Sequence, residues 1–112
     1  MGKLDLTSIV EKSQAESGLI FDSEGHTLDS YKVSNENNVS AMIGVIVTMS
    51  NELLQDTMET KIGDDTNAIS LASKSGFIII EKISKDQFIC LITKDLSNAN
   101  FMKLTLRKIV SA

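Results

Sequence analysis

Between Asn38 and Asp56 the apolar positions recur at steps of three and four residues, which predicts a long helix. We expect one stripe of large apolar side chains to face the core: Val39, Met42, Ile43, Ile46, Met49 and Leu53. The other side carries small uncharged residues where a water-facing surface would hold Lys and Glu: Ser40, Ala41, Gly44, Thr48 and Asn51. This pattern favours a helix that packs on its own sheet with one side and on a partner with the other. A polar surface helix that is merely short of charge is the alternative.

Two shorter helices are predicted near the ends of the chain. Residues 4–15 place four side chains on one helical face: Leu6, Ile9, Val10 and Ser13. A last helix is expected to begin near Ser97 or Asn98 as its N-cap and to turn four apolar residues inward: Met102, Leu106, Ile109 and Val110.

Alternating and continuous apolar runs predict strands at residues 18–22, 26–31, 66–73, 77–83 and 88–92. A turn at residues 22–25, in which Gly25 can take positive φ, joins the first two strands into a hairpin. The second strand sets Leu28 among polar neighbours, which indicates a sheet edge. Residues 61–65 predict a loop after the long helix, and Gly63 suits the end of a helix.

The predicted order of elements is helix, two strands, helix, three strands, helix. Short connections between consecutive strands make the sheet largely antiparallel. The four consecutive large apolar residues Phe77–Ile80 require a sheet that is covered on both faces. The long helix is expected to cover one face and the two terminal helices the other. The sequence therefore predicts an α+β fold in a single domain spanning residues 1–112.

The strand at residues 66–73 has neither a charged residue nor a proline, the usual devices that protect an exposed sheet edge. If this strand lies at the edge, pairing with the same strand of a second copy would protect it. The long helix offers a second contact, because Ser40, Gly44 and Thr48 lie one turn apart and would let another backbone approach. Both features predict a symmetric homodimer.

The charge balance excludes some partners. The net charge is −4 and Arg107 is the single arginine, which argues against nucleic acid and against an anionic membrane surface. With Cys90 as its one cysteine the chain fits a reducing compartment. The opening residues Met1, Gly2 and Lys3 do not begin a signal peptide, and no apolar window has the length of a transmembrane helix. We therefore expect a cytoplasmic protein.

No catalytic, cofactor or metal site emerges from the sequence. His26 is the single histidine and is expected at the surface of a hairpin, and Cys90 lies in an apolar strand where it should be a buried small hydrophobe. Asp22, Glu24 and Asp29 cluster on the first hairpin, but their spacing fails the calcium-loop pattern, so a solvated turn is favoured over a cation site. The chain has no P-loop and no G-x-G-x-x-G motif. We expect no enzyme activity and no cofactor.

The segment GLIFDSEGHTLDS at residues 18–30 resembles the opening hairpin of the roadblock family of dynein light-chain and GTPase-regulator domains. The Ala-, Met- and Ile-rich helix and the later three strands follow the same order, so the resemblance extends from about Leu6 to Val110. It implies a five-stranded antiparallel sheet with the long helix on one face and the first and third helices on the other. It also implies dimers in which the third strands pair into one continuous sheet and the long helices lie side by side. Tyr31 and Lys32 depart from the small residues common at the end of the family's second strand. This departure concerns the identity of the partner and not the fold.

The expected dimer contacts are five residues of the long helix and four of the uncharged strand: Ser40, Gly44, Val47, Thr48, Asn51, Ala68, Ile69, Ser70 and Leu71. The family's prokaryotic members resemble partners of small Ras-like GTPases, and its animal members include dynein adaptors and lysosomal scaffolds. We therefore predict a non-enzymatic homodimeric regulator or scaffold of a small Ras-like GTPase. A structural adaptor that resembles a dynein light chain, with no nucleotide-dependent binding, is the alternative. A small-ligand sensor is a third hypothesis, which the aromatic-poor core supports weakly.

Arginine bears on the predicted mechanism, because GTPase activators often insert one to stabilise charge in the transition state. Arg107 lies with Lys103 and Lys108 on the last helix, where basic residues complement the C-terminal end of a helix. We therefore expect any stimulation of GTP hydrolysis to come from positioning the GTPase's own residues.

Overall fold

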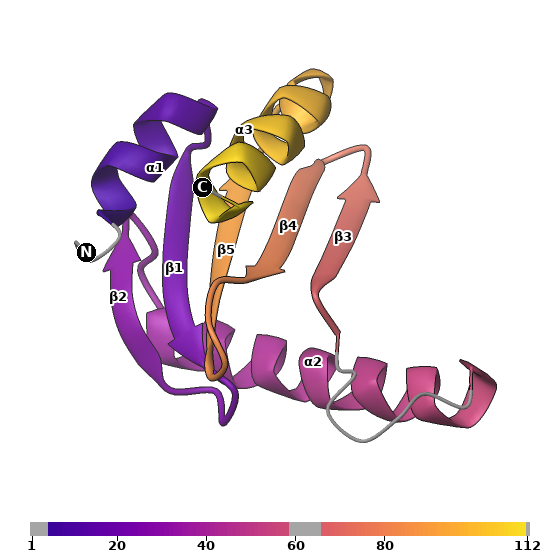
Figure 1. The fold of residues 1–112 in the computed structure, drawn as a ribbon. Helices are drawn as coiled ribbons and strands as arrows, with labels where there is room; N and C mark the ends of the chain where they lie inside the picture. The colour runs from indigo at the N-terminus through magenta and orange to yellow at the C-terminus, as the bar shows by residue number, and fades with distance from the viewer. Residues whose placement is uncertain (1–4, 59–65, 112) are drawn as a thin grey trace.

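The computed structural model describes residues 5–58 and 66–111, and its elements follow the predicted order (Figure 1). They are α1 (Leu6–Ser13), β1 (Ser17–Asp22), β2 (Thr27–Tyr31), α2 (Glu36–Met58), β3 (Ala68–Ser73), β4 (Gly76–Lys82), β5 (Gln87–Thr93), η1 (Leu96–Asn98) and α3 (Ala99–Ser111). Helices and strands begin and end close to the predicted residues. The helix end expected at Gly63 lies outside the described residues.

The strands form one five-stranded sheet in the order β2-β1-β5-β4-β3. Every neighbouring pair is antiparallel, and β1 and β5 lie side by side in the middle although they are far apart in the sequence. The edges are β2, as its polar residues predicted, and β3, for which an edge position was the condition of the predicted strand pairing. The α+β class and the antiparallel sheet are confirmed.

One face of the sheet is covered by α1 and α3 (Figure 1). From the strands, Phe77, Ile79, Ile89 and Leu91 point to this face. They form a buried cluster with apolar side chains of the two helices: Leu6, Ile9, Val10, Met102 and Leu106. Each side chain of this kind contributes roughly 1.5–3 kcal/mol when fully buried. The last helix also turns Ile109 and Val110 towards this cluster, where they are half-buried.

The other face is covered by α2. Ile43 and Val47 of α2 meet a second buried cluster on the sheet: Leu19, Phe21, Ile80, Phe88 and Cys90. Within it the rings of Phe21 and Phe88 stack with centroids 5.4 Å apart. Ile79 and Ile80 are neighbours in β4 and belong to opposite clusters, so the unbroken apolar run of β4 is buried from both sides. The predicted placement of the long helix and the terminal helices is confirmed.

The chain enters α3 through the short 3-10 turn η1. The carboxylate of Asp95 caps this turn, because its Oδ1 accepts a hydrogen bond from the N–H of Ser97 at 3.1 Å. α3 itself begins at Ala99, directly after the expected N-cap position Asn98, and Asp95 caps the 3-10 turn that precedes it.

The side of α2 that faces the sheet is mainly the small one, which corrects our prediction. The buried residues of α2 are Ser40, Ile43, Gly44 and Val47. Of the stripe predicted to face the core, Ile43 alone is buried and Val39 and Ile46 are half-buried. The other three members of that stripe are exposed: Met42, Met49 and Leu53.

The physical reason is a close approach between α2 and the hairpin that joins β1 to β2. A Cβ atom on Gly44 would lie 2.9 Å from the Cα of Gly25, so the two backbones touch where a side chain would separate them. Gly25 has φ +88, a conformation that favours glycine, as predicted for this turn. Beside this contact, the hydroxyls of Ser40 and Thr27 are hydrogen-bonded at 2.7 Å. The small side of α2 does admit another backbone, but that backbone belongs to the same chain.

We expect Gly44→Ala to lower the free energy of unfolding by about 1–3 kcal/mol, because the added methyl group would force the hairpin away from α2. The opposite result would be expected of an exposed helix position, where this change gains about 1 kcal/mol of helix propensity. The measurement is urea denaturation at one protein concentration. Gln55→Ala, at an exposed position of the same helix, is the control and should shift stability by less than about 0.5 kcal/mol. A Gly44→Ala variant as stable as the parent would contradict the close approach.

Candidate functional site

A row of exposed apolar side chains runs along α2, and we call it the outer stripe: Met42, Val45, Met49 and Leu53. Their exposed fractions lie between 58% and 63%. Because they follow one another at steps of three and four residues, they share one side of the helix. α2 has no lysine or arginine, and the acids on this side, Glu52 and Asp56, lie towards its C-terminal end. A row of this kind is typical of a protein–protein contact.

α2 is longer than the sheet that it covers. Its 23 residues span roughly 34 Å at 1.5 Å per residue. Strands lie about 4.8 Å apart, so five of them span only about 19 Å. Figure 1 shows the C-terminal turns of α2 projecting past the edge strand β3.

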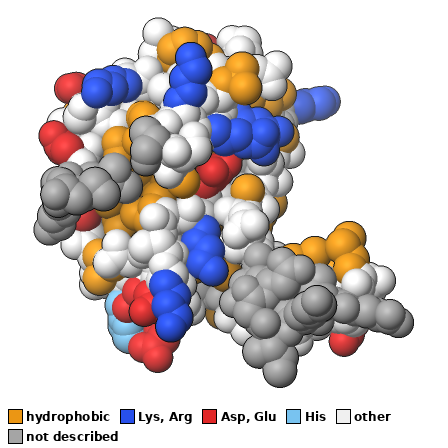
Figure 2. Space-filling model, viewed as in Figure 1, with side chains coloured by type: hydrophobic (Ala, Val, Ile, Leu, Met, Phe, Trp, Pro, Cys, Tyr) orange, Lys and Arg blue, Asp and Glu red, His pale blue; other side chains and the backbone are white. Residues whose placement is uncertain are grey.

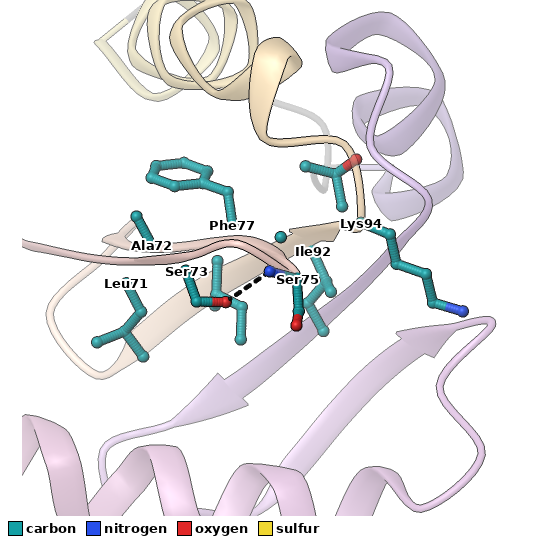
Figure 3. A pocket seen from close by; sticks show the side chains of 10 residues that line it. Leu71, Ala72, Ser73, Ser75, Phe77, Ile92 and Lys94 are labelled. Carbon is teal, nitrogen blue, oxygen red and sulfur yellow. Dashed lines mark hydrogen bonds between the residues drawn. The ribbon is translucent and has the colours of Figure 1, made fainter.

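A second apolar surface lies on the same face of the sheet, beside the edge strand. Leu71 is 42% exposed, and its neighbours Ile78 and Ile92 are half-buried. They border an open cavity of about 250 Å³, in which Leu71 and Ile92 point to one side of the sheet and Ala72 and Phe77 to the other (Figure 3). We call Leu71, Ile78 and Ile92 the open sheet patch.

The expected dimer contacts fall into two groups in the structure. Ser40, Gly44 and Val47 are buried within the chain itself, so their assignment to a dimer surface is corrected. Asn51 is half-buried, and its Oδ1 accepts a hydrogen bond from the N–H of Thr66 at 2.7 Å. The remaining five are half-buried or exposed: Thr48, Ala68, Ile69, Ser70 and Leu71.

The outer stripe was missed because its large side chains were assigned to the core. The periodicity alone could not have corrected this, since α2 is apolar on more than one side. The length of the predicted helix could have shown only that its end extends past the sheet, because a helix longer than the sheet is wide cannot be covered along its whole length.

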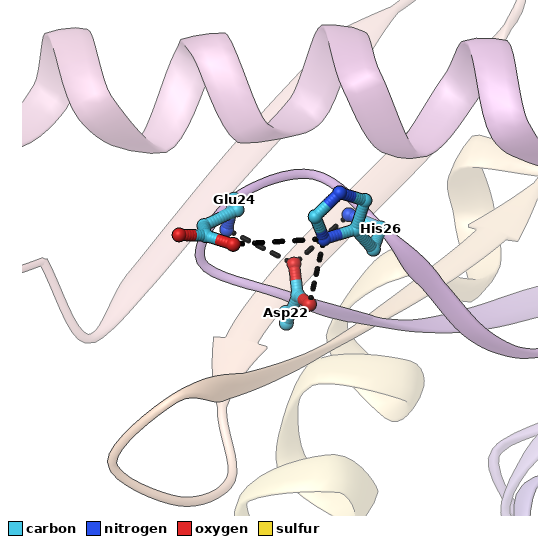
Figure 4. Close-up of side chains that lie close together, drawn as sticks. All are labelled: Asp22, Glu24 and His26. Carbon is cyan, nitrogen blue, oxygen red and sulfur yellow. Dashed lines mark hydrogen bonds and ion pairs between the residues drawn. The ribbon is translucent and has the colours of Figure 1, made fainter.

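Asp22, Glu24 and His26 lie together at the tip of the β1–β2 hairpin, with possible ligand atoms within 4.8 Å of one another (Figure 4). Oδ1 of Asp22 accepts the N–H groups of Glu24 and His26 at 3.0 and 2.9 Å, and its Oδ2 lies 3.1 Å from Nδ1 of His26. Both oxygens of this carboxylate therefore fix the turn. Asp29 stands apart from this group, and its carboxylate accepts the N–H of Ser30. This geometry favours the predicted solvated turn over a cation site.

The same hydrogen bonds hold the pKa of Asp22 below its ordinary value of 3.8. The N–H of His26 contributes most, with smaller contributions from the side chain of His26 and the N–H of Glu24. These bonds favour the charged carboxylate, so the turn is most stable when Asp22 is ionised.

Cys90 is fully buried in the cluster beneath α2. Burial raises the pKa of its thiol to about 12. The thiol is therefore protonated at neutral pH and cannot act as a nucleophile. This agrees with the small buried hydrophobe predicted from the sequence.

No protein-family model matches the chain, and no curated protein matches its sequence. Solved structures do match. MglB of Myxococcus xanthus superposes with a TM-score of 0.78 at 10% identity, over 93% of this chain and 84% of that one. The gliding protein MglB of Thermus thermophilus gives a TM-score of 0.79 at 11% identity, over 94% and 79% of the two chains. A roadblock/LC7 domain from Streptomyces avermitilis gives 0.71 at 9% identity, over 96% and 95%.

The chain has the roadblock fold. The likeness covers nearly the whole chain in each superposition, and it lies in the arrangement of the backbone rather than in shared residues. The resemblance inferred from residues 18–30 and from the order of elements is thereby confirmed at the level of the fold. Within residues 5–58 and 66–111, no helix of this roadblock fold combines the length and the apolar character needed to cross a bilayer.

We expect Asp22→Ala to lower the melting temperature at neutral pH, because two backbone N–H groups of the turn lose their acceptor. Since the pKa of Asp22 is lowered in the folded state, its stabilisation is present above the ordinary pKa and is lost as the pH falls through the folded pKa. The difference in melting temperature between parent and variant should therefore shrink in acid. Thermal unfolding followed by circular dichroism from pH 7 down to pH 2 measures it. Asp29→Ala is the control and should leave the melting temperature almost unchanged; a difference for Asp22→Ala that stays constant with pH would contradict this role.

Proposed function

We propose that this roadblock-fold chain is a homodimeric regulator or scaffold of a small Ras-like GTPase, and that it acts without catalytic residues of its own. The observation that carries the dimer is the pairing of two apolar surfaces on one side of the sheet. The C-terminal turns of α2 project past the edge strand β3 (Figure 1), and the open sheet patch lies at that edge on the same face of the sheet.

A second copy is the occupant that fits both surfaces. If the β3 strands of two chains lie side by side, the projecting turns of each α2 reach under the open sheet patch of the other chain. The contact is then reciprocal, as a two-fold interface requires. The two α2 helices run next to each other with Met49 and its neighbours between them.

The edge strand supports the same arrangement. β3 has no charge and no proline, and Ala68, Ser70 and Leu71 are exposed along it. Its outer backbone groups face no other strand of the described chain. Pairing with β3 of a second copy would use these groups and join the two sheets into one. That one MglB structure has a tetrameric arrangement supports self-association for this fold.

The GTPase is proposed from the roadblock resemblance, which implies small Ras-like GTPases as partners, and from the match to MglB structures. A regulatory or scaffold role agrees with the positions of the single cysteine and the single histidine. Cys90 is buried and protonated, and His26 is exposed on a hairpin. We place the protein in the cytoplasm, the reducing compartment that a lone unpaired cysteine fits.

Arg107 supports a mechanism without an inserted arginine. Its Nε lies 3.5 Å from Oε2 of Glu81, whose side chain is only 9% exposed. Withdrawing the guanidinium would leave a nearly buried carboxylate without its partner, which is costly. We therefore propose that the dimer positions residues that the GTPase itself supplies.

We expect Met49→Glu to convert the dimer into a monomer, because the change would place two carboxylates between paired α2 helices. The dissociation constant should rise at least about tenfold, the equivalent of about 1.4 kcal/mol. Sedimentation equilibrium over a range of concentrations measures it, and urea denaturation of the monomer checks that the fold survives.

The matched control is Asn37→Glu, which adds the same charge to an exposed position at the N-terminal end of α2, far from its projecting turns. It should stay dimeric. If the parent protein is a monomer at micromolar concentration, or if both variants dissociate equally, the proposed interface is wrong.

We expect the dimer to bind one small Ras-like GTPase of the source organism differently in its GTP and GDP states. Pull-down with each GTPase loaded with GDP or a non-hydrolysable GTP analogue tests this. If hydrolysis is stimulated, Arg107→Ala should retain the stimulation once its binding is matched to that of the parent. Loss of stimulation with binding intact would overturn the mechanism. Binding that ignores the nucleotide would favour the structural adaptor instead.

A further inference from the structure

Another exposed surface, separate from the outer stripe and the open sheet patch, lies on α3. It is on the opposite face of the sheet. Phe101 and Leu104 are 46% and 61% exposed, and their spacing places them side by side on the helix. The same helix carries three cations: Arg107 and Lys108 are exposed and follow Leu104 by three and four residues, and Lys103 is half-buried. We call these five residues the α3 patch. In Figure 2, which views this face, Lys and Arg side chains gather over its upper part, interleaved with hydrophobic ones.

The charge of the α3 patch opposes that of the chain as a whole. α3 contains no acidic residue, whereas the protein carries a net charge of −4. Arg107 is held by Glu81 at 3.5 Å, which fixes its guanidinium and offsets part of its charge. Among the described residues, neither Lys103 nor Lys108 has a carboxylate within ion-pair distance. Lys103 and Lys108 therefore have no charge partner in the described chain, and Lys108 lies on the same side of α3 as Leu104.

We propose that the α3 patch binds an acidic amphipathic segment of a partner protein. The segment would place a bulky apolar side chain against Phe101 and Leu104, and carboxylates against Lys103 and Lys108. The proposal rests on charge complementarity. Cations without a charge partner, next to an apolar pair on an otherwise acidic protein, favour a ligand that carries negative charge. The apolar pair supplies contact area, and the cations supply orientation and a faster encounter.

A single helical segment fits this surface better than an anionic membrane. α1 lies beside α3 on the same face, and its exposed charges together with the preceding Asp5 are two acids and one base: Asp5, Glu11 and Lys12. A flat bilayer would meet both helices, so the acids of α1 would oppose the attraction of α3. A helix about 10 Å wide can contact α3 alone. The patch is also too small for nucleic acid, which needs a longer basic surface.

This inference goes beyond the proposed dimer and does not depend on it. The α3 patch lies on the opposite face of the sheet from the outer stripe and the open sheet patch, so it stays accessible whether or not two copies pair. Pairing through β3 would place two α3 patches on one side of the joined sheet. A partner with two acidic segments would then bind with added avidity.

The probe is a fluorescent helical peptide of about 15 residues, with Leu along one side and Glu on the others. Fluorescence anisotropy with the full chain measures its affinity, and ¹⁵N-labelled protein maps the binding site. We expect binding that weakens as salt is added and chemical-shift changes centred on α3. A matched peptide with Lys in place of Glu should not bind.

Variants separate this site from general charge effects. Lys103→Glu combined with Lys108→Glu should weaken binding at least about tenfold. The control, Lys74→Glu combined with Lys85→Glu, changes the net charge equally at two exposed turns and should change affinity by less than about twofold. Leu104→Ser with Lys108→Glu, both at exposed positions, is a second variant and should also weaken binding if the first fails to fold.

Three results would overturn the proposal. The control pair could weaken binding as much as the α3 pair, which would show a non-specific charge effect. The chemical-shift changes could map away from α3. Vesicles of phosphatidylserine and phosphatidylcholine could retain the parent protein while the acidic peptide fails to bind, which would assign the surface to a membrane. A monomeric parent that still binds the acidic peptide would leave this proposal standing while the dimer fails.

Discussion

The contact between Gly25 and Gly44 determines how α2 is rotated on the sheet. Because no side chain separates the hairpin from the helix, α2 lies directly against the β1–β2 turn and presents its small residues there. Ser40 adds a hydroxyl hydrogen bond to Thr27 on the same side. Once that side is turned inward, the outer stripe must face outward, so a backbone contact in one hairpin determines which surface is offered to other molecules.

The order of elements and the two-sided cover of the sheet could be predicted from the sequence because both follow from local patterns. The continuous run Phe77–Ile80 required apolar cover above and below, and the two clusters supply it. The rotation of α2 could not be predicted in the same way. Periodicity shows which side chains share a side of a helix, but not whether the same chain covers that side, and Met42 and Met49 were assigned to the core for that reason.

The candidate site was predicted in part. The argument from β3 was conditional on this strand lying at the edge of the sheet, and the structure places it there with Leu71 exposed. The helical half was wrong at Ser40 and Gly44, where small residues were taken as room for another chain although they accommodate a hairpin of their own. The acidic residues of the first hairpin also differ in their hydrogen bonds. Asp22 accepts the N–H groups that fix the turn, whereas Asp29 accepts only that of Ser30, and the spacing of these residues in the sequence does not reveal the difference.

The two sides of α2 are under different structural constraints. Residues such as Gly44 are constrained by the fold, since the hairpin leaves no space for a larger one. Those of the outer stripe make few contacts within the chain and can change without disturbing it. After a gene duplication, substitutions at Val45 or Leu53 could therefore change which chain binds to α2. The two different chains would then form a heterodimer while each of them still folds. The residues of α2 that maintain the fold and those that select the binding partner would then evolve independently, although they belong to the same helix.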